Sequence, residues 1–194
     1  MAREERSAIE LTAPEAYFNR ELSWLTFARR VLALAEDPDL PLLERVKFAG
    51  IVGMLHDEFS MKRVSGLKRQ IEAKKKKLSL DGRTPAEEFA ACREMLAEQK
   101  ELLAEIVRGR LRPALDEAGM PIREWADLDA TSQEHLRTYF RNSVYPILTP
   151  LAVDSEHPFP FISSGGLNLA VLLPDDGPTG QRFVRIKVPG NRPR

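Results

Sequence analysis

The chain has 194 residues, of which 43% are hydrophobic and 30% charged, a balance typical of a soluble globular protein and unlike that of a disordered chain. The 29 basic residues balance the 29 acidic ones, so no whole-molecule field holds the chain on nucleic acid or an anionic membrane, and any polyanion site must be local. A single cysteine, Cys92, excludes an intramolecular disulfide, and no stretch reaches the roughly 18 apolar residues of a membrane span, so we expect a cytoplasmic protein.

The first predicted helix begins after Asn19, a residue type that favours the N-cap, and ends at Asp37-Pro38. A second helical period begins after Pro41 and continues to Ile71. Gly50, Gly53 and the MLHDE segment weaken this period midway, which predicts a kink or two abutting helices. The apolar residues that define the first helix are Leu22, Leu25, Ala28, Val31, Leu32 and Ala35.

The strongest local signal is a capping box, Thr84-Pro85-Ala86-Glu87, with proline at the first helical position. Asp81-Gly82 marks the turn before it, so this helix should pack antiparallel against the preceding one. The sequence therefore predicts an up-and-down helical bundle over residues 1–112, ending near Arg112-Pro113. The face predicted to be buried in this helix contains Phe89, Leu96, Leu103 and Ile106.

The pattern changes over residues 113–194. Thr131-Ser132-Gln133-Glu134 is a second capping box, and it predicts a short helix that Pro146 ends. Two strand-like runs follow at 167–173 and 182–188, with Arg185 and Lys187 expected to face outward, and residues 174–180 supply a hairpin turn. The predicted fold class is α+β: an N-terminal antiparallel helical bundle followed by the beginning of a mixed α/β domain.

The predicted hairpin has an apolar face and no cover. An isolated two-stranded hairpin is marginal in water, and only residues 189–194 follow this one. Further chain or a partner must complete the sheet, so we expect the sequence to be a truncated piece of a longer protein.

Several long motifs occur in order along the chain. They are YFNRELSWLTF at 17–27, PLLERVKF at 41–48, DEF at 57–59, RV at 63–64, GLKR at 66–69, LTPLAVD at 148–154, HPFPFIS at 157–163 and LNLAV at 167–171. Together they resemble the long-chain polyphosphate kinases, first their N-terminal domain and then the start of their middle, or head, domain. The resemblance covers nearly the whole chain, from Tyr17 to Pro189.

This resemblance implies reversible transfer of the terminal phosphate of ATP to polyphosphate, with Mg²⁺ in the complete enzyme, a homo-oligomer and no nucleic-acid partner. In that family a phosphohistidine, the arginines that hold phosphate and a metal site lie in C-terminal domains, and nothing here resembles those segments. The resemblance therefore implies no catalytic residue, no metal ligand and no bound cofactor in this chain. It would be a scaffold that shapes the nucleotide entrance and subunit contacts, inactive alone.

One nucleotide contact is expected within this segment. The family's N-terminal domain carries an asparagine just before Leu-Asp-Glu-Phe, and this asparagine contacts the nucleotide base. Here the run is Leu55-His56-Asp57-Glu58-Phe59, so Leu55 occupies that position. An aliphatic side chain can pack on adenine but offers neither donor nor acceptor. Leu55 is the candidate nucleotide-binding residue, with simple core packing as the alternative.

The three histidines lack a catalytic context. His56, beside two carboxylates, is expected at the surface or as a cap, and His135 and His157 are expected to be structural. Trp24 and Phe27, in the first helix, are expected in the core.

The lysine run Lys74-Lys75-Lys76-Lys77 could attract polyphosphate by counterion release, but a solvated helix end is the interpretation we favour. Gly165-Gly166 and residues 175–177 are expected to be turns. Two other functions stay open: a non-enzymatic helical interaction or dimerisation module, and a polyanion or nucleic-acid binder that uses the lysine run. The uncovered strands favour the first of these two.

Overall fold

The computed structural model describes residues 10–154, 156–163, 165–174 and 180–190. The chain divides into two compact units, residues 1–122 and 123–194. The first unit is helical, and the second holds one helix and a small sheet. The α+β fold class predicted from the sequence is therefore confirmed.

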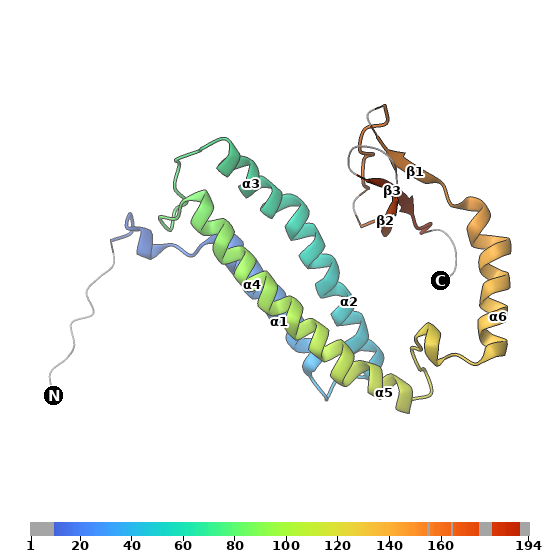
Figure 1. Ribbon diagram of the computed structural model, residues 1–194. Helices are drawn as coiled ribbons and strands as arrows, with labels where there is room; N and C mark the ends of the chain where they lie inside the picture. The colour runs from blue at the N-terminus through green and yellow to red at the C-terminus, as the bar shows by residue number, and fades with distance from the viewer. Residues whose placement is uncertain (1–9, 155, 164, 175–179, 191–194) are drawn as a thin grey trace. The chain divides into compact units, whose positions relative to one another are not determined.

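Five α-helices lie in the described part of the first unit (Figure 1): α1 (Arg20–Glu36), α2 (Leu42–Phe59), α3 (Ser65–Glu72), α4 (Pro85–Ile106) and α5 (Arg112–Glu117). A π-helical turn, Ser60–Val64, joins α2 to α3, and a second one, Val107–Leu111, joins α4 to α5. α1 packs on both α2 and α4, and α3 packs on α4. The predicted antiparallel bundle is thus formed by three long helical rods: α1, α2 with α3, and α4 with α5.

Side-chain caps set where two of these rods begin. The Asn19 side-chain oxygen accepts the backbone N–H groups of Glu21 and Leu22 at the start of α1. Thr84 and Glu87 form the predicted reciprocal capping box at the start of α4. Each cap satisfies backbone donors that have no partner inside the helix, which is why these two boundaries could be predicted from sequence.

A kink at Gly50 and Gly53 is wrong, because α2 continues through both glycines. The alternative of two abutting helices is confirmed, because α2 and α3 follow one another through the π turn that begins just after the MLHDE segment. The buried residues Ala49, Val52, His56 and Phe59 anchor this helix on its neighbours, and tertiary packing outweighs a local glycine penalty. The irregularity lies later, in the π turn at Ser60–Val64.

The last rod also passes its predicted end. Pro113 follows the π turn Val107–Leu111 directly, and the helix runs on to Glu117. A π turn leaves one carbonyl without its usual partner, so a residue that lacks an N–H is accommodated there.

Two apolar clusters form the core of the first unit. Trp24 stacks on Phe59 at the edge of one cluster, with ring centroids 4.9 Å apart, whereas Phe27 is 52% exposed. The prediction for Trp24 is confirmed and that for Phe27 is wrong, because Phe27 lies off the buried stripe of α1. One cluster is built on Leu32, Ala35, Ala49, Val52, Ile106 and Leu111, and the other on Leu25, Phe59, Leu67, Cys92 and Leu96.

The second unit contains α6 (Ala130–Tyr139), β1 (Pro150–Val153), β2 (Asn168–Pro174) and β3 (Gln181–Lys187). The strand order is β1-β3-β2 with both pairs antiparallel, and Val184 lies opposite Ala152 on one side and Val171 on the other. The hairpin strands are confirmed. The isolated two-stranded hairpin is wrong, because β1 pairs with the free edge of β3. Residues 175–179 of the predicted turn lie outside the described residues.

The N-cap of α6 lies two residues before the predicted one. It is Asp129, whose carboxylate accepts the backbone N–H of Ser132 at 2.8 Å. The box predicted at 131–134 is therefore wrong, since a carboxylate just upstream supplies the cap instead. The helix continues through a π turn and ends in a 3₁₀ turn, Tyr145–Ile147, which contains Pro146 as predicted.

Arg185 is buried in the central strand, which corrects the prediction that it faces outward, whereas Lys187 is exposed as expected. The Nε of Arg185 donates to the Asn168 side-chain oxygen at 2.8 Å. A strand flanked on both edges by other strands is covered more fully than an outer strand, so alternation alone misplaces this residue.

Candidate functional site

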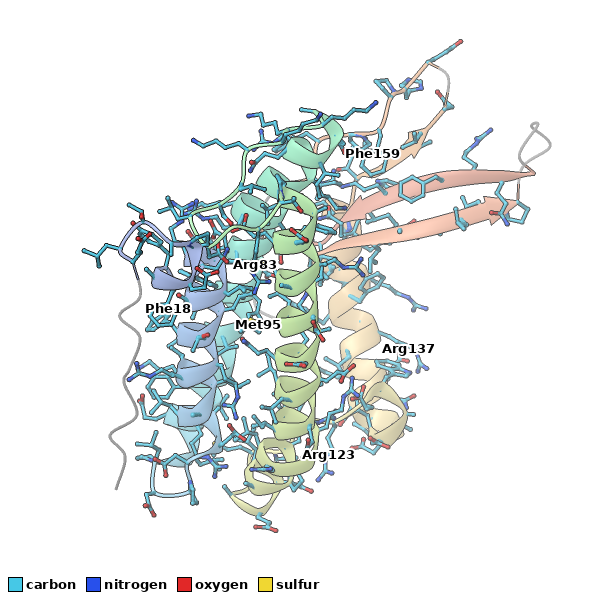
Figure 2. All side chains as sticks on the ribbon, turned by 90° about the vertical axis from the view of Figure 1, so that its left-hand side faces the viewer. Phe18, Arg83, Met95, Arg123, Arg137 and Phe159 are labelled. Atoms are coloured by element: carbon cyan, nitrogen blue, oxygen red, sulfur yellow. The ribbon has the colours of Figure 1, made fainter. Side chains whose placement is uncertain are left out.

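A pocket of about 480 Å³ opens at the end of the first unit where α1 and α4 begin. Figure 2 shows Phe18 and Arg83 at this end, with Met95 farther along α4. The lining comes from the start of α1, from the π turn and α3, from the loop after α3 and from the start of α4. We call this cavity the basic pocket. Residues of the motif at 17–27 meet residues of the motifs at 63–64 and 66–69 in its wall, although these segments are distant in sequence.

Asn19 ties three elements together beneath the pocket. While its oxygen caps α1, its Nδ2 donates to Asp81 at 3.0 Å and to Glu88 at 2.9 Å. It is 7% exposed, so these hydrogen bonds are formed away from solvent. The start of α1 is thus fixed to the 81–83 turn and to the first turns of α4.

Asp81 lines the pocket and is the centre of the turn before α4. It accepts the Ser79 hydroxyl at 2.6 Å and the Arg83 Nε at 2.9 Å, in addition to the Asn19 amide. Burial acts to raise the pKa of this carboxyl, but the hydrogen bonds from Ser79, Asn19 and Arg83 outweigh burial and the pKa is lowered. Asp81 is therefore an ionised structural anchor, and Gly82 completes its turn at φ +81°.

Glu21 is buried between two arginines from different elements. Arg20 Nη2 lies 2.8 Å from one carboxylate oxygen, and Arg63 Nε lies 3.5 Å from the other. The hydrogen bond to Glu21 and its negative charge raise the pKa of Arg20. The carboxylate is on the inside and both guanidinium groups are partly exposed, so the triad presents one net positive charge outward.

The pocket as a whole carries a positive excess, because six basic and three acidic side chains line it. All three carboxylates accept hydrogen bonds from neighbouring side chains. Lys62 pairs with Glu58, whereas no described residue pairs with Lys75 or Lys77. The basic residues are Arg20, Lys62, Arg63, Lys75, Lys77 and Arg83.

The lysine run begins where α3 ends. Lys74 adopts a left-handed conformation at φ +50°, its N–H bonds to the Ile71 carbonyl at 2.9 Å, and the N–H of Lys75 bonds to the Gln70 carbonyl at 3.0 Å. This paired pattern is a Schellman C-cap. The chain then leaves the helix without regular structure, and Lys75 and Lys77 line the pocket whereas Lys74 and Lys76 do not. The run is a solvated helix end, as we favoured, and half of it also borders a cavity.

Leu55 lies away from the basic pocket. It is half-buried on α2, between exposed Met54 and buried His56, and it does not line the pocket. The structure therefore does not bring the candidate nucleotide residue together with the basic cluster.

The expectation that His56 lies at the surface or serves as a cap is wrong, because His56 is 2% exposed and faces the core. Gln99 Nε2 donates to the Leu25 carbonyl at 2.9 Å, so its Oε1 is the acceptor for His56 Nε2, also at 2.9 Å. The histidine must then carry its proton on Nε2. Its Nδ1 is buried without a hydrogen-bond partner among the described residues.

His135 and His157 are both exposed. The ring of His157 lies 2.9 Å from Asp154, which also accepts the backbone N–H groups of Glu156 and His157 after β1. The hydrogen bonds from His157 lower the pKa of Asp154. This arrangement closes a turn.

The described residues contain no group of three or more His, Cys, Asp or Glu side chains able to hold a metal ion. None of their helices combines the length and apolar character that crossing a membrane requires.

Sequence reasoning missed most of the basic pocket. Arg20, Arg63 and Arg83 were not singled out, because their neighbours lie far along the chain. The available signal was an arginine followed by a glutamate directly after the N-cap, at Arg20 and Glu21.

The fold and its motifs match a known pair of domains. Residues 17–123 match the family profile described as polyphosphate kinase N-terminal domain, and residues 131–194 match the profile described as polyphosphate kinase middle domain. The helical unit and the mixed unit thus match the N-terminal and middle domains of this family, in that order. The chain belongs to the polyphosphate kinase family.

Several relatives are similar over most of this chain. The polyphosphate kinase of Mycobacterium marinum is 50% identical over 179 residues, which cover 91% of this chain and 24% of the relative. That of Mycolicibacterium gilvum is 51% identical over 187 residues, which cover 95% of this chain and 25% of the relative. The crystal structure of the polyphosphate kinase from Porphyromonas gingivalis matches with a TM-score of 0.65 and 28% identity, covering 87% of this chain and 24% of that one. The chain spans about a quarter of the length of these relatives.

Proposed function

We propose that the complete protein transfers the terminal phosphate of ATP reversibly to polyphosphate and that residues 1–194 form its N-terminal scaffold. The observation that carries this proposal is the tandem match to two consecutive domains of one family, at about half identity to mycobacterial polyphosphate kinases. Mg²⁺, the phosphorylated histidine and the arginines that hold phosphate then belong to domains that the 194 residues do not include. A cytoplasmic homo-oligomer is part of the same proposal.

None of the three histidines is proposed to carry phosphate. His56 is buried against Gln99 and has no room to receive a phosphoryl group, and His157 is engaged with Asp154 in a turn. The 194-residue chain should therefore neither make polyphosphate nor acquire an acid-labile label from ATP labelled at its terminal phosphate. The full-length protein that contains this segment should do both, and histidine labelling of the short chain would contradict the proposal.

Leu55 is proposed to face the nucleotide base in the complete enzyme. In the full-length protein, Leu55→Asn should lower the KM for ATP by more than that for a triphosphate lacking the adenine amine. A restored neutral hydrogen bond is worth about 0.5–1.5 kcal/mol, or roughly two- to tenfold in KM.

Met54→Asn is the matched control for this test, because the neighbouring side chain is mostly exposed. It should leave both Michaelis constants unchanged. Equal effects of Leu55→Asn on the two triphosphates would show that Leu55 packs in the core and has no contact with the base.

A second candidate is a non-enzymatic interaction module. The observation in its favour is the outer strand β2, on which Leu169, Leu172 and Leu173 remain exposed. Gel filtration of the 194-residue chain separates the two ideas. A closed dimer that Leu172→Lys abolishes would support the module, and a monomer would support a scaffold that needs its own further domains.

A further inference from the structure

The basic pocket does not include Leu55, the residue proposed above to face the nucleotide. Its charged side chains form two layers. The inner layer consists of Glu21, Asp81 and Glu88, each of which accepts hydrogen bonds from side chains of the pocket wall. The outer layer consists of guanidinium and ammonium groups. Those that bond to the inner layer keep 42–77% of their side-chain surface exposed: Arg20 and Arg63 on Glu21, and Arg83 on Asp81. The carboxylates orient the arginines without cancelling the positive excess.

The size and the spread of charge suit an elongated anion. At about 480 Å³ the cavity falls within the range of small-molecule sites and far exceeds the roughly 30 Å³ that one water occupies. Its cations come from four separate segments: the start of α1, the π turn, the loop after α3 and the turn before α4. Arginine forks match phosphate oxygens, and lysines add flexible point charges.

We propose that the basic pocket binds a chain of phosphate groups and that its ligand is inorganic polyphosphate. Arg20 and Arg63, held by Glu21, contact the chain on one side, and Lys75 and Lys77 contact it on the other. The choice of ligand rests on the proposed function. The site itself is tested by binding to the 194-residue chain, so catalysis and binding can fail separately.

The lysine run offers a matched pair of variants for the test. Lys75→Gln with Lys77→Gln removes two charges from the pocket lining, and Lys74→Gln with Lys76→Gln removes two charges from the same run outside the lining. No described residue pairs with Lys75 or Lys77 and both are exposed, so thermal unfolding should not distinguish the first variant from the parent.

Binding of inorganic phosphate, tripolyphosphate, long-chain polyphosphate and ATP to the 194-residue chain is measured by titration calorimetry at several salt concentrations. Affinity should rise with chain length. The Lys75/Lys77 variant should lose about tenfold or more for long-chain polyphosphate and lower the salt slope by about 1 to 2, while the Lys74/Lys76 variant should change affinity less than about twofold.

Three results would overturn the proposal. Equal losses in both lysine variants would show a diffuse surface charge without a site, and no binding by the parent chain would show that the pocket does not hold phosphate groups. Tighter binding of ATP than of tripolyphosphate, with the difference removed by Phe18→Ala at the exposed rim, would make the pocket a nucleotide site.

Discussion

The buried contact between His56 and Gln99 gives a sharp test of the bundle interior, through leucine substitutions made singly and together. Gln99→Leu leaves the His56 Nε2–H without an acceptor, beside an Nδ1 that already has no partner among the described residues. We expect a loss of about 1–3 kcal/mol in the free energy of unfolding. His56→Leu leaves Gln99 Oε1 without a donor but also removes the unpartnered Nδ1. Its net effect should therefore lie within about 1 kcal/mol of the parent.

The double variant removes every side-chain atom that would be left unpaired, and the Leu25 carbonyl keeps its bond within α1. Together the two substitutions should cost about 1–3 kcal/mol less than the sum of their separate costs. Urea denaturation measures this, followed by the fluorescence of Trp24, which stacks on Phe59. A Trp125→Phe background makes Trp24 the single tryptophan of the chain.

Leu32→Ala and Leu96→Ala serve as a control, since they belong to different clusters and should add. Additive effects of the histidine and glutamine changes, within about 0.5 kcal/mol, would refute the assigned hydrogen bond and with it the proton on Nε2.

Three further predictions concern the same unit. Phe89 is only half-buried at the rim of its cluster, so Phe89→Ala should cost about 1–3 kcal/mol in the free energy of unfolding measured in urea. Ile106→Ala, at a fully buried site, should cost more, roughly 2–5 kcal/mol. The reverse order would show that the buried face of α4 is misassigned. The folded-state pKa of Asp81 lies below its ordinary value of 3.8, so the stabilisation by its carboxylate is present above that value and is lost as pH falls through the folded pKa. Asp81→Asn should therefore flatten the fall in the free energy of unfolding between about pH 5 and about pH 2. An unchanged slope would argue against Asp81 as an ionised anchor. Lys74→Gly should stabilise α3 by about 0.5–1 kcal/mol in thermal unfolding, because a left-handed C-cap suits glycine. Gly119→Lys, at the equivalent cap of α5, should cost about 1–2 kcal/mol. No change in either variant would show that backbone strain does not matter at these caps.

Features set by local chemistry were predictable from the sequence. Asn19 and Thr84 cap their helices through side chain-to-backbone bonds that span at most three residues, so their residue types alone locate the helix starts. The strands of the hairpin were predictable in the same way, from alternation within each run.

Features set by packing were not predictable. The burial of His56 depends on helices that arrive from elsewhere in the sequence, and that of Arg185 depends on having strands at both edges of β3. β1 has four residues, too few to show a period. The basic pocket forms only when residues between 18 and 88 come together in the fold. The lysine run was the one part of it that the sequence analysis considered for binding an anion.

The two π turns of the first unit have a consequence for how its sequence tolerates length changes. A π turn holds one more residue than the α turn it replaces, so the helix beyond it is rotated by about 100° relative to an uninterrupted helix. Removing one residue from Ser60–Val64 would leave a regular helix whose far half presents a different face. Leu67 would leave its cluster and Arg63 would leave Glu21. A single-residue deletion there should therefore be more damaging than any conservative substitution in the turn.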